Sequence, residues 1–173
     1  VFAAIIGTGV GAGLVVDGRL ITGPNRLAGE WGQNPIPGPM DSYERSVARH
    51  CGRTGAIECF LSGPGLSASH EARTGKPAAP EEILSLYREG CPVAGGTMDL
   101  YFERSARAFS SVVNLLDPDV IICGGGMSAI SELYQELPRR ITAYVASERF
   151  STPVRPALHG SSSGVRGSAW LWD

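Results

Sequence analysis

The segment that most constrains the fold covers residues 5–19, with the sequence IIGTGVGAGLVVDGR. Apolar runs flank a glycine-rich turn, and Asp17-Gly18 separates two further apolar runs, which is a strong signal for a tight β-hairpin. With the apolar residues before it, the segment predicts an antiparallel meander of three strands. The 23 glycines and 12 prolines of the 173-residue chain are high for a helical bundle and agree with a mixed α/β protein rich in turns.

The rest of the chain predicts alternating helices and strands after an irregular excursion rich in proline and glycine. The longest helix keeps one face apolar, and the strand after it is continuously apolar, as in a strand buried on both faces of a sheet. The expected elements are an excursion over about 23–55, a short helix from Gly55 that Gly63-Pro64 ends, a helix from Pro80 to Gly90, a long helix over about 98–116, a strand over 120–123, a helix over 130–144 with Pro138 inside it, a strand over about 153–160 and a closing helix over 163–173.

The size and composition indicate one domain, or one lobe of a two-lobed protein, with a substantial core. Hydrophobic residues make up 43% of the chain and charged residues 18%, which argues against disorder. The net charge of −2, without a basic cluster, argues against nucleic acid as a partner. No segment has the pattern of a signal peptide or a membrane span, and no C-x-x-C pair occurs among the 4 cysteines. We therefore expect a cytoplasmic protein with reduced thiols.

Two glycine-rich turns are candidates for ligand binding. Gly7-Thr8-Gly9 follows a strand and offers bare amide groups and a hydroxyl to a phosphate, although glycines also relieve an ordinary hairpin. Residues 124–126 follow the buried strand, where ligands collect in open α/β sheets, but glycines there also permit tight helix packing. Neither turn has the Walker pattern, so each alone leaves both interpretations open. The two turns together are the arrangement of an actin-like nucleotide-binding lobe.

Five segments occur in the order seen in the ROK family of sugar kinases and sugar-responsive repressors: GTGVGAGLVVDGRL, AGEWGQNPIP, CGRTGAIE, NLLDPDVIICGGGMS and HGSSSGVRGSAWL. Residues 1–173 resemble the C-terminal lobe of that family, and are most similar to bacterial fructokinases of the manno(fructo)kinase type. The resemblance implies an α/β fold of the actin-like ATPase (ribonuclease H-like) class, ATP with Mg²⁺ as phosphoryl donor, and a hexose substrate, with fructose as the expected sugar. It also implies a homodimer, for which the helices around residues 84–109 are a candidate contact.

The resemblance also implies the residues of the site. An ionised carboxylate can accept hydrogen bonds from two sugar hydroxyls, so glutamates suit a sugar pocket. The implied contacts are Gly7, Thr8 and Gly9 to the β- and γ-phosphates, Gly124, Gly125 and Gly126 to the adenosine, and Glu30, Gln33 and Glu58 to the sugar.

The chain departs from the family pattern at the zinc site. The positions that hold the zinc ligands in the family carry Gln33, Arg49, Cys51 and Ala56. One thiolate remains, whereas a closed structural zinc site needs four N or S ligands. His50 and Cys59 are near in the sequence, but their use as ligands would require a different geometry. We therefore predict that no zinc is bound and that Gln33 hydrogen-bonds a sugar hydroxyl.

The D-x-G-G-T-K segment and the catalytic aspartate of the family's kinases precede the part that this chain resembles. We therefore expect no catalytic residue in this chain and no turnover by this polypeptide alone, because phosphoryl transfer needs positioning and charge stabilisation together. The main interpretation is a sugar kinase represented by its C-terminal lobe. The alternatives are the sugar-sensing domain of a ROK repressor and an inactive remnant of the fold. The two intact glycine turns favour the kinase, because repressors have less need of them.

Overall fold

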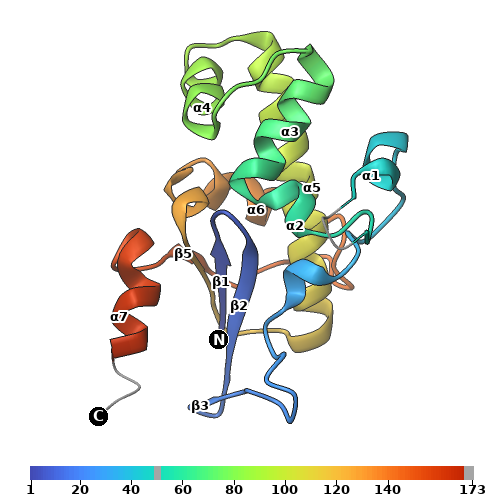
Figure 1. The fold of residues 1–173 in the computed structure, drawn as a ribbon. Coiled ribbons are helices and arrows are strands. Elements are labelled where there is room, and N and C mark those ends of the chain that lie inside the picture. The colour runs from blue at the N-terminus through green and yellow to red at the C-terminus, as the bar shows by residue number, and fades with distance from the viewer. Residues whose placement is uncertain (49–51, 170–173) are drawn as a thin grey trace.

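A five-stranded mixed sheet organises the molecule (Figure 1). The computed structural model describes residues 1–48 and 52–169. β1 is central in the strand order β3-β2-β1-β4-β5, and it pairs antiparallel with β2 and parallel with β4. The strands are β1 (Phe2–Ile6), β2 (Val10–Val16), β3 (Arg19–Leu20), β4 (Ile121–Gly124) and β5 (Val154–Pro156). The predicted meander of three strands is confirmed.

The two hairpin turns follow from their residues. Asp17 and Gly18 have φ angles of 50° and 72°, the positive values that a type I′ turn requires and that Asp-Gly favours. The other turn is Gly7-Thr8-Gly9, which lies between the paired residues Ile6 and Val10. The sheet therefore presents this second turn at the carboxyl end of its central strand.

The helices surround the sheet and extend beyond it at the top of Figure 1, where α3 and α4 lie near α5. α5 is the long predicted helix, and its apolar face is buried. The helical elements are the 3₁₀ turn η1 (Trp31–Gln33), α1 (Ser42–Ser46), α2 (Glu58–Leu61), α3 (Gly63–Thr74), α4 (Pro80–Arg88), α5 (Pro92–Leu116), the 3₁₀ turn η2 (Gly126–Ala129), α6 (Leu133–Ile141), the 3₁₀ turn η3 (Gly160–Ser162) and α7 (Ser163–Ala169).

One boundary prediction was wrong. Gly63-Pro64 does not end a helix but begins α3, and Ser62 separates it from α2. The Ser62 hydroxyl oxygen accepts a hydrogen bond from the Gly65 amide at 3.1 Å, as an N-cap residue does. Proline fits the first turn of a helix, because its missing N–H has no partner to lose there. The sequence Ser-Gly-Pro is therefore a start signal here.

The excursion over residues 23–55 packs onto the core instead of forming a linker. Trp31 and Ile36 are buried in it. The Trp31 ring contacts Phe2 of β1 and Phe109 of α5, with ring centroids 5.4 Å and 4.9 Å apart. The excursion is thus fixed against both the sheet and the long helix, and α1 is its one α-helix within the described residues.

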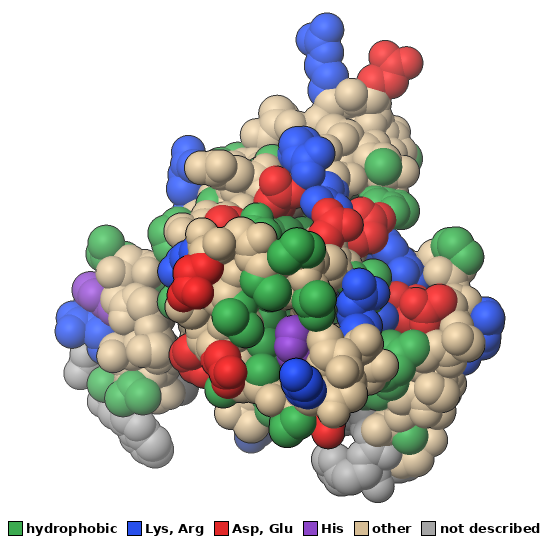
Figure 2. All heavy atoms as spheres, turned by 90° about the horizontal axis from the view of Figure 1, so that it is seen from above, with side chains coloured by type: hydrophobic (Ala, Val, Ile, Leu, Met, Phe, Trp, Pro, Cys, Tyr) green, Lys and Arg blue, Asp and Glu red, His purple; other side chains and the backbone are tan. Residues whose placement is uncertain are grey.

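The surface carries charges of both signs. On the face shown in Figure 2, acidic and basic side chains are interspersed around hydrophobic ones, in keeping with the small net charge. No helix in the described part of the chain is long and apolar enough to cross a membrane.

Candidate functional site

A hollow of about 600 Å³ opens where four segments converge. The turn between β1 and β2 forms one wall, the first residues of α3 and α4 form two others, and η2 with the residue after it forms the last. The lining residues are Gly7, Thr8, Gly63, Pro64, Ser67, Ala79, Pro80, Glu81, Leu84, Gly126, Met127, Ala129 and Ile130. The hollow therefore joins parts of both glycine-rich turns that the sequence singled out.

The first turn leaves hydrogen-bond donors available. The Gly7 amide donates to the Gly9 carbonyl at 2.9 Å, and the Gly7 carbonyl accepts from the Gly63 amide at 2.8 Å. Among the described residues we find no acceptor for the amides of Thr8 and Gly9 or for the Thr8 hydroxyl. Both residues are exposed. Of the three residues expected to meet phosphates, Gly7 thus shapes the turn, while Thr8 and Gly9 carry the free donors.

In the second turn, two of the three glycines are packed against neighbouring segments and the third lines the hollow. Gly124 is buried in β4, and a Cβ on it would lie 3.1 Å from the Ile5 side chain. Gly125 has a φ of 82°, and a Cβ on it would lie 2.4 Å from the Ile6 carbonyl oxygen. Gly126 alone of the three lines the hollow. The expected contact of all three with adenosine remains a prediction.

The far wall of the hollow combines apolar side chains with one carboxylate, and no motif in the sequence marks it as part of a site. Leu84, Met127 and Ile130 supply the apolar surface, and Glu81 lies at the start of α4. The sequence predicted a helix that begins at Pro80, but nothing in it indicated that this helix start faces the β1–β2 turn. Only the packing of α4 against the rest of the fold brings these residues together.

An ion pair fixes the end of α4, the helix whose start forms part of this wall. Arg88, at the end of α4, donates from Nε to Glu132 Oε1 at 2.8 Å and from Nη2 to Glu132 Oε2 at 3.0 Å. Arg88 also donates to the Ser131 hydroxyl at 3.2 Å. The hydrogen bond from Arg88 is the main cause that lowers the pKa of Glu132 to about 2. Glu132 is therefore ionised at neutral pH and holds α4 near the end of η2.

The two candidate sugar glutamates approach the β1–β2 turn differently. Glu58, the first residue of α2, accepts a hydrogen bond from the Val10 amide at 2.9 Å through Oε2. The same oxygen would lie 2.8 Å from a Cβ placed on Gly9. Glu30 is exposed and lines a second hollow, of about 730 Å³, together with Thr8 and Gly9. Both carboxylates thus lie near the predicted phosphate turn, and their contact with sugar remains a prediction.

The segment Ala-Gly-Glu-Trp-Gly has a clear structural reason for its glycines. A Cβ on Gly29 would lie 1.8 Å from the Ala12 carbonyl oxygen, and one on Gly32 would lie 2.1 Å from the Val10 carbonyl oxygen. Trp31 Nε1 donates to the Gly11 carbonyl at 2.8 Å. The segment therefore lies directly against β2, which leaves Glu30 exposed beside the turn.

The altered zinc positions are only partly described. Gln33 is half-buried at the end of η1, and Ala56 pairs with Pro35 in an isolated bridge. Residues 49–51, namely Arg49, His50 and Cys51, lie outside the described residues. Gln33 lines a third hollow with Glu30, away from the phosphate turn. The absence of zinc remains a prediction, which metal analysis of the purified protein can test.

Comparison with known proteins identifies the family. A model of the ROK family matches residues 1–173. An N-acetyl-D-glucosamine kinase from Vibrio atlanticus (strain LGP32) is 35% identical over 173 residues, which cover 96% of this chain and 57% of that protein. This chain belongs to the ROK family. The predicted family is confirmed, whereas these relatives do not support the fructokinase type.

Solved structures of ROK proteins share the fold. A ROK family glucokinase from Streptomyces griseus in complex with glucose and AMPPNP matches with a TM-score of 0.85 and 22% identity, over 98% of this chain and 59% of that chain. A ROK family transcriptional regulator, a homologue of the E. coli MLC protein, matches with a TM-score of 0.73 and 24% identity, over 90% of this chain and 41% of that chain. The predicted actin-like α/β fold is confirmed. This ROK chain spans a little over half the length of the kinases it matches.

Proposed function

We propose that this chain is the C-terminal, nucleotide- and sugar-binding lobe of an ATP-dependent hexose kinase. The observation that carries the proposal is the hollow of about 600 Å³, which combines free donors of the β1–β2 turn with an apolar wall. A nucleotide needs both kinds of surface, because its phosphates require donors and its base requires apolar contact. The kinase relative from Vibrio and the AMPPNP complex of the Streptomyces protein support the same interpretation.

The residues of the hollow suggest how a nucleotide would lie in it. Phosphates would lie at the amide and hydroxyl of Thr8, where this hollow meets the second one that Gly9 lines, and the adenosine would extend past Gly126 toward Leu84. Glu81 would repel a phosphate, so its carboxylate suits hydroxyl groups such as those of ribose. The N-terminus of α3 adds its dipole but not the Gly63 or Gly65 amides, which already bond Gly7 and Ser62.

Magnesium would neutralise charge on the phosphates. No group of three or more His, Cys, Asp or Glu side chains in the described part of the chain could hold a metal ion. Magnesium usually keeps several waters and binds through substrate phosphates with one or two carboxylates. The nucleotide itself would thus be its main ligand on this side of the site.

The proposal also concerns which hexose is the substrate. The N-acetyl-D-glucosamine kinases among the relatives make that sugar the first candidate, while the sequence resemblance to fructokinases keeps fructose as the second. Glu30 is the residue proposed to bind sugar hydroxyls, because it is exposed beside the turn that would hold the phosphates. Gln33 and Glu58 remain further proposed sugar contacts.

The deciding experiment is an ATP-coupled kinase assay on the whole protein with N-acetyl-D-glucosamine, fructose and glucose. We expect turnover on at least one hexose. Glu30→Ala should raise the KM for the sugar by about tenfold or more with little change in the KM for ATP, because a carboxylate that binds hydroxyls makes charge-assisted hydrogen bonds. Thr8→Val should instead raise the KM for ATP with little change in the KM for the sugar. An equal effect of Glu30→Ala on both substrates would make Glu30 a structural residue.

A sugar sensor is the second candidate function, since a ROK transcriptional regulator has the same fold. Such a protein would bind a sugar without turning over ATP. Absence of turnover on every hexose, together with saturable sugar binding by calorimetry, would replace the kinase proposal with this one. Homodimerisation likewise remains a proposal, which sedimentation of the whole protein can test.

A further inference from the structure

A buried arginine on α5 lacks one of its hydrogen-bond partners. The side chain of Arg104 is 1% exposed, and its Nη2 atom has no hydrogen-bond partner among the described residues. Asp41 Oδ2 lies 3.9 Å from Nη2, which is within the range of an ion pair but too far for a hydrogen bond. A buried guanidinium N–H without a hydrogen-bond acceptor costs free energy, and the charge of this group is only partly compensated by Asp41 at that distance.

The remaining atoms of Arg104 are tightly fixed. Nε donates to Glu44 Oε1 at 2.9 Å, and Nη1 donates to the Ser69 hydroxyl at 3.0 Å. The guanidinium carbon lies 4.6 Å from the centroid of the Phe60 ring and 5.4 Å from that of Tyr43. Nη2 therefore cannot turn toward another protein acceptor without breaking these contacts.

The unpartnered atom belongs to a side chain that lines a small cavity. This cavity has a volume of about 150 Å³ and lies between α1, α3 and α5. Its lining residues are Asp41, Tyr43, Ser69, Ala72, Arg73, Leu100 and Arg104. One water occupies about 30 Å³ of liquid volume, so the cavity has room for a larger group such as a phosphate or a carboxylate.

The charges at the cavity favour an anion. Arg73 and Arg104 line it against the single carboxylate of Asp41. Behind them, Glu44 is shared with Arg107, whose Nη1 lies 2.9 Å from Glu44 Oε1. Ser69 accepts from Arg104, which leaves its own hydroxyl proton available for donation. We propose that this cavity is a binding site for a small oxyanion, held by Arg73 and the Ser69 hydroxyl, with the buried positive charge of Arg104 behind them.

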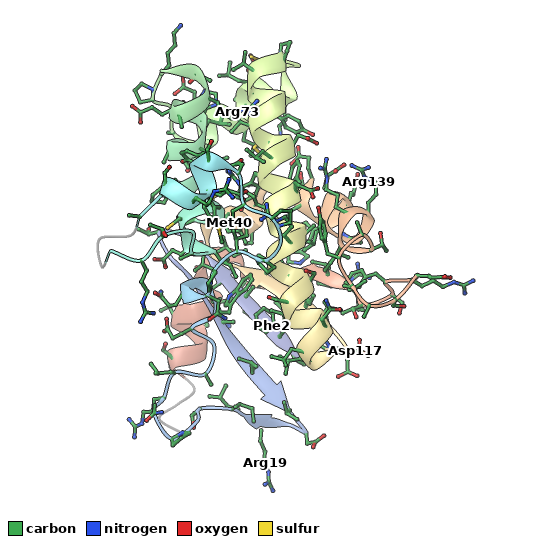
Figure 3. All side chains as sticks on the ribbon, turned by 90° about the vertical axis from the view of Figure 1, so that its right-hand side faces the viewer. Phe2, Arg19, Met40, Arg73, Asp117 and Arg139 are labelled. Carbon is green, nitrogen blue, oxygen red and sulfur yellow. The ribbon has the colours of Figure 1, made fainter. Side chains whose placement is uncertain are left out.

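The cavity is separate from the proposed nucleotide site but shares a helix with it. Ser67 of α3 lines the large hollow, whereas Ser69, Ala72 and Arg73 of the same helix line the cavity. An oxyanion bound here would contact α3 from the side that does not face the nucleotide. Figure 3 shows Arg73 near one end of the molecule, far from Arg19 at the other end, which makes Arg19 a suitable control.

The test is calorimetric titration of the whole protein with inorganic phosphate and, in a second arm, with acetate, at constant ionic strength maintained with sodium chloride. We expect saturable binding of at least one probe, and the two arms distinguish a tetrahedral from a planar group. Arg73→Gln should weaken that binding by about tenfold, because it removes a charge-assisted contact. Ala72→Leu, which fills the cavity without changing charge, should abolish it.

Arg19→Gln is the matched control, since it removes an exposed arginine of β3 outside the cavity. Its affinity for the probe should equal that of the unchanged protein. The proposal is overturned if neither probe saturates up to about 50 mM, an affinity too weak for a built site. It is also overturned if Arg73→Gln and Ala72→Leu bind the probe as Arg19→Gln does, because the anion then lies elsewhere.

Discussion

At the scale of single residues, the glycines of this chain belong to two groups that look alike in the sequence. Thr8-Gly9 leaves amides free at an exposed turn. Gly29, Gly32 and Gly125 instead allow backbone segments to approach one another, because a Cβ on any of them would overlap a carbonyl oxygen. The first group is available to a ligand, and the second holds the neighbouring segments in place.

Gly32→Ala should therefore destabilise the protein without a direct effect on ligand contacts. Its Cβ would lie 2.1 Å from the Val10 carbonyl oxygen, so either β2 or η1 must move, at a cost of about 1–3 kcal/mol. Gly13→Ala is the control, because no atom lies within 4 Å of its added Cβ. Denaturant unfolding of both variants gives the two free energies. Equal midpoints would mean that the contact between η1 and β2 is not tight in solution.

At the scale of elements, α4 is the most distinctive wall of the proposed nucleotide site. Its start lines the hollow with Pro80 and Glu81, while its end is tied to Glu132 by Arg88. Ile83 is its one fully buried residue. Leu84 and Tyr87 also pack against the core, so the ion pair adds to apolar contacts that hold this wall in position.

Arg88→Gln should weaken nucleotide binding by a few-fold and change global stability little, since solvent screens an exposed ion pair. The measurement is the dissociation constant for ATP. Arg139→Gln is the control, because it breaks a comparable exposed pair with Glu136 that forms no part of the hollow. If both variants bind ATP equally well, the ion pair does not position α4.

The same pair predicts a pH dependence. The pKa of Glu132 is lowered in the folded protein from 4.5 to about 2, mainly by the hydrogen bond from Arg88. A lowered carboxyl pKa stabilises the folded state fully above the ordinary value, and this contribution is lost as the pH falls through the folded value. The contribution of the pair should therefore be constant at neutral pH and decrease below about pH 4.5, toward pH 2.

At the scale of the whole molecule, a buried ionic cluster joins the excursion to the long helix. Glu44 of α1 is 1% exposed and pairs with Arg104 and Arg107 of α5, each at 2.9 Å. Arg107 also donates to the carbonyls of Pro37 and Pro39, at 2.6 Å and 3.1 Å. The cluster connects residues about sixty positions apart in the chain, and so it fixes the position of a segment with little regular structure.

Glu44→Gln should lower the free energy of unfolding by about 3–5 kcal/mol, because it leaves two buried guanidinium groups without their carboxylate. Glu71→Gln, at an exposed position of α3, is the control and should be nearly neutral. Urea unfolding measures both. A loss below about 1 kcal/mol for Glu44→Gln would show that water reaches the cluster and hydrates the two guanidinium groups.

The sequence by itself determined the local structure and the family. Alternating apolar runs, Asp17-Gly18 and the face of the long helix act within a few residues or turns, so they predicted the meander, α5 and β4 correctly. The order of five short segments was specific enough to indicate the ROK family. The start of α3 was misread because glycine and proline can end one helix or begin the next, and the hydrogen bond to Ser62 decides between them.

Only the tertiary structure decided which of these residues meet. Three features depend on contacts between distant segments: the apolar wall opposite the β1–β2 turn, the different surroundings of Gly126 and its two neighbours Gly124 and Gly125, and the unpartnered Nη2 of Arg104. Such contacts follow from how whole elements pack, and a local pattern carries no information about its distant partner. A glycine beside a ligand and a glycine beneath a carbonyl oxygen are identical in sequence, and they differ only in what the fold places against them.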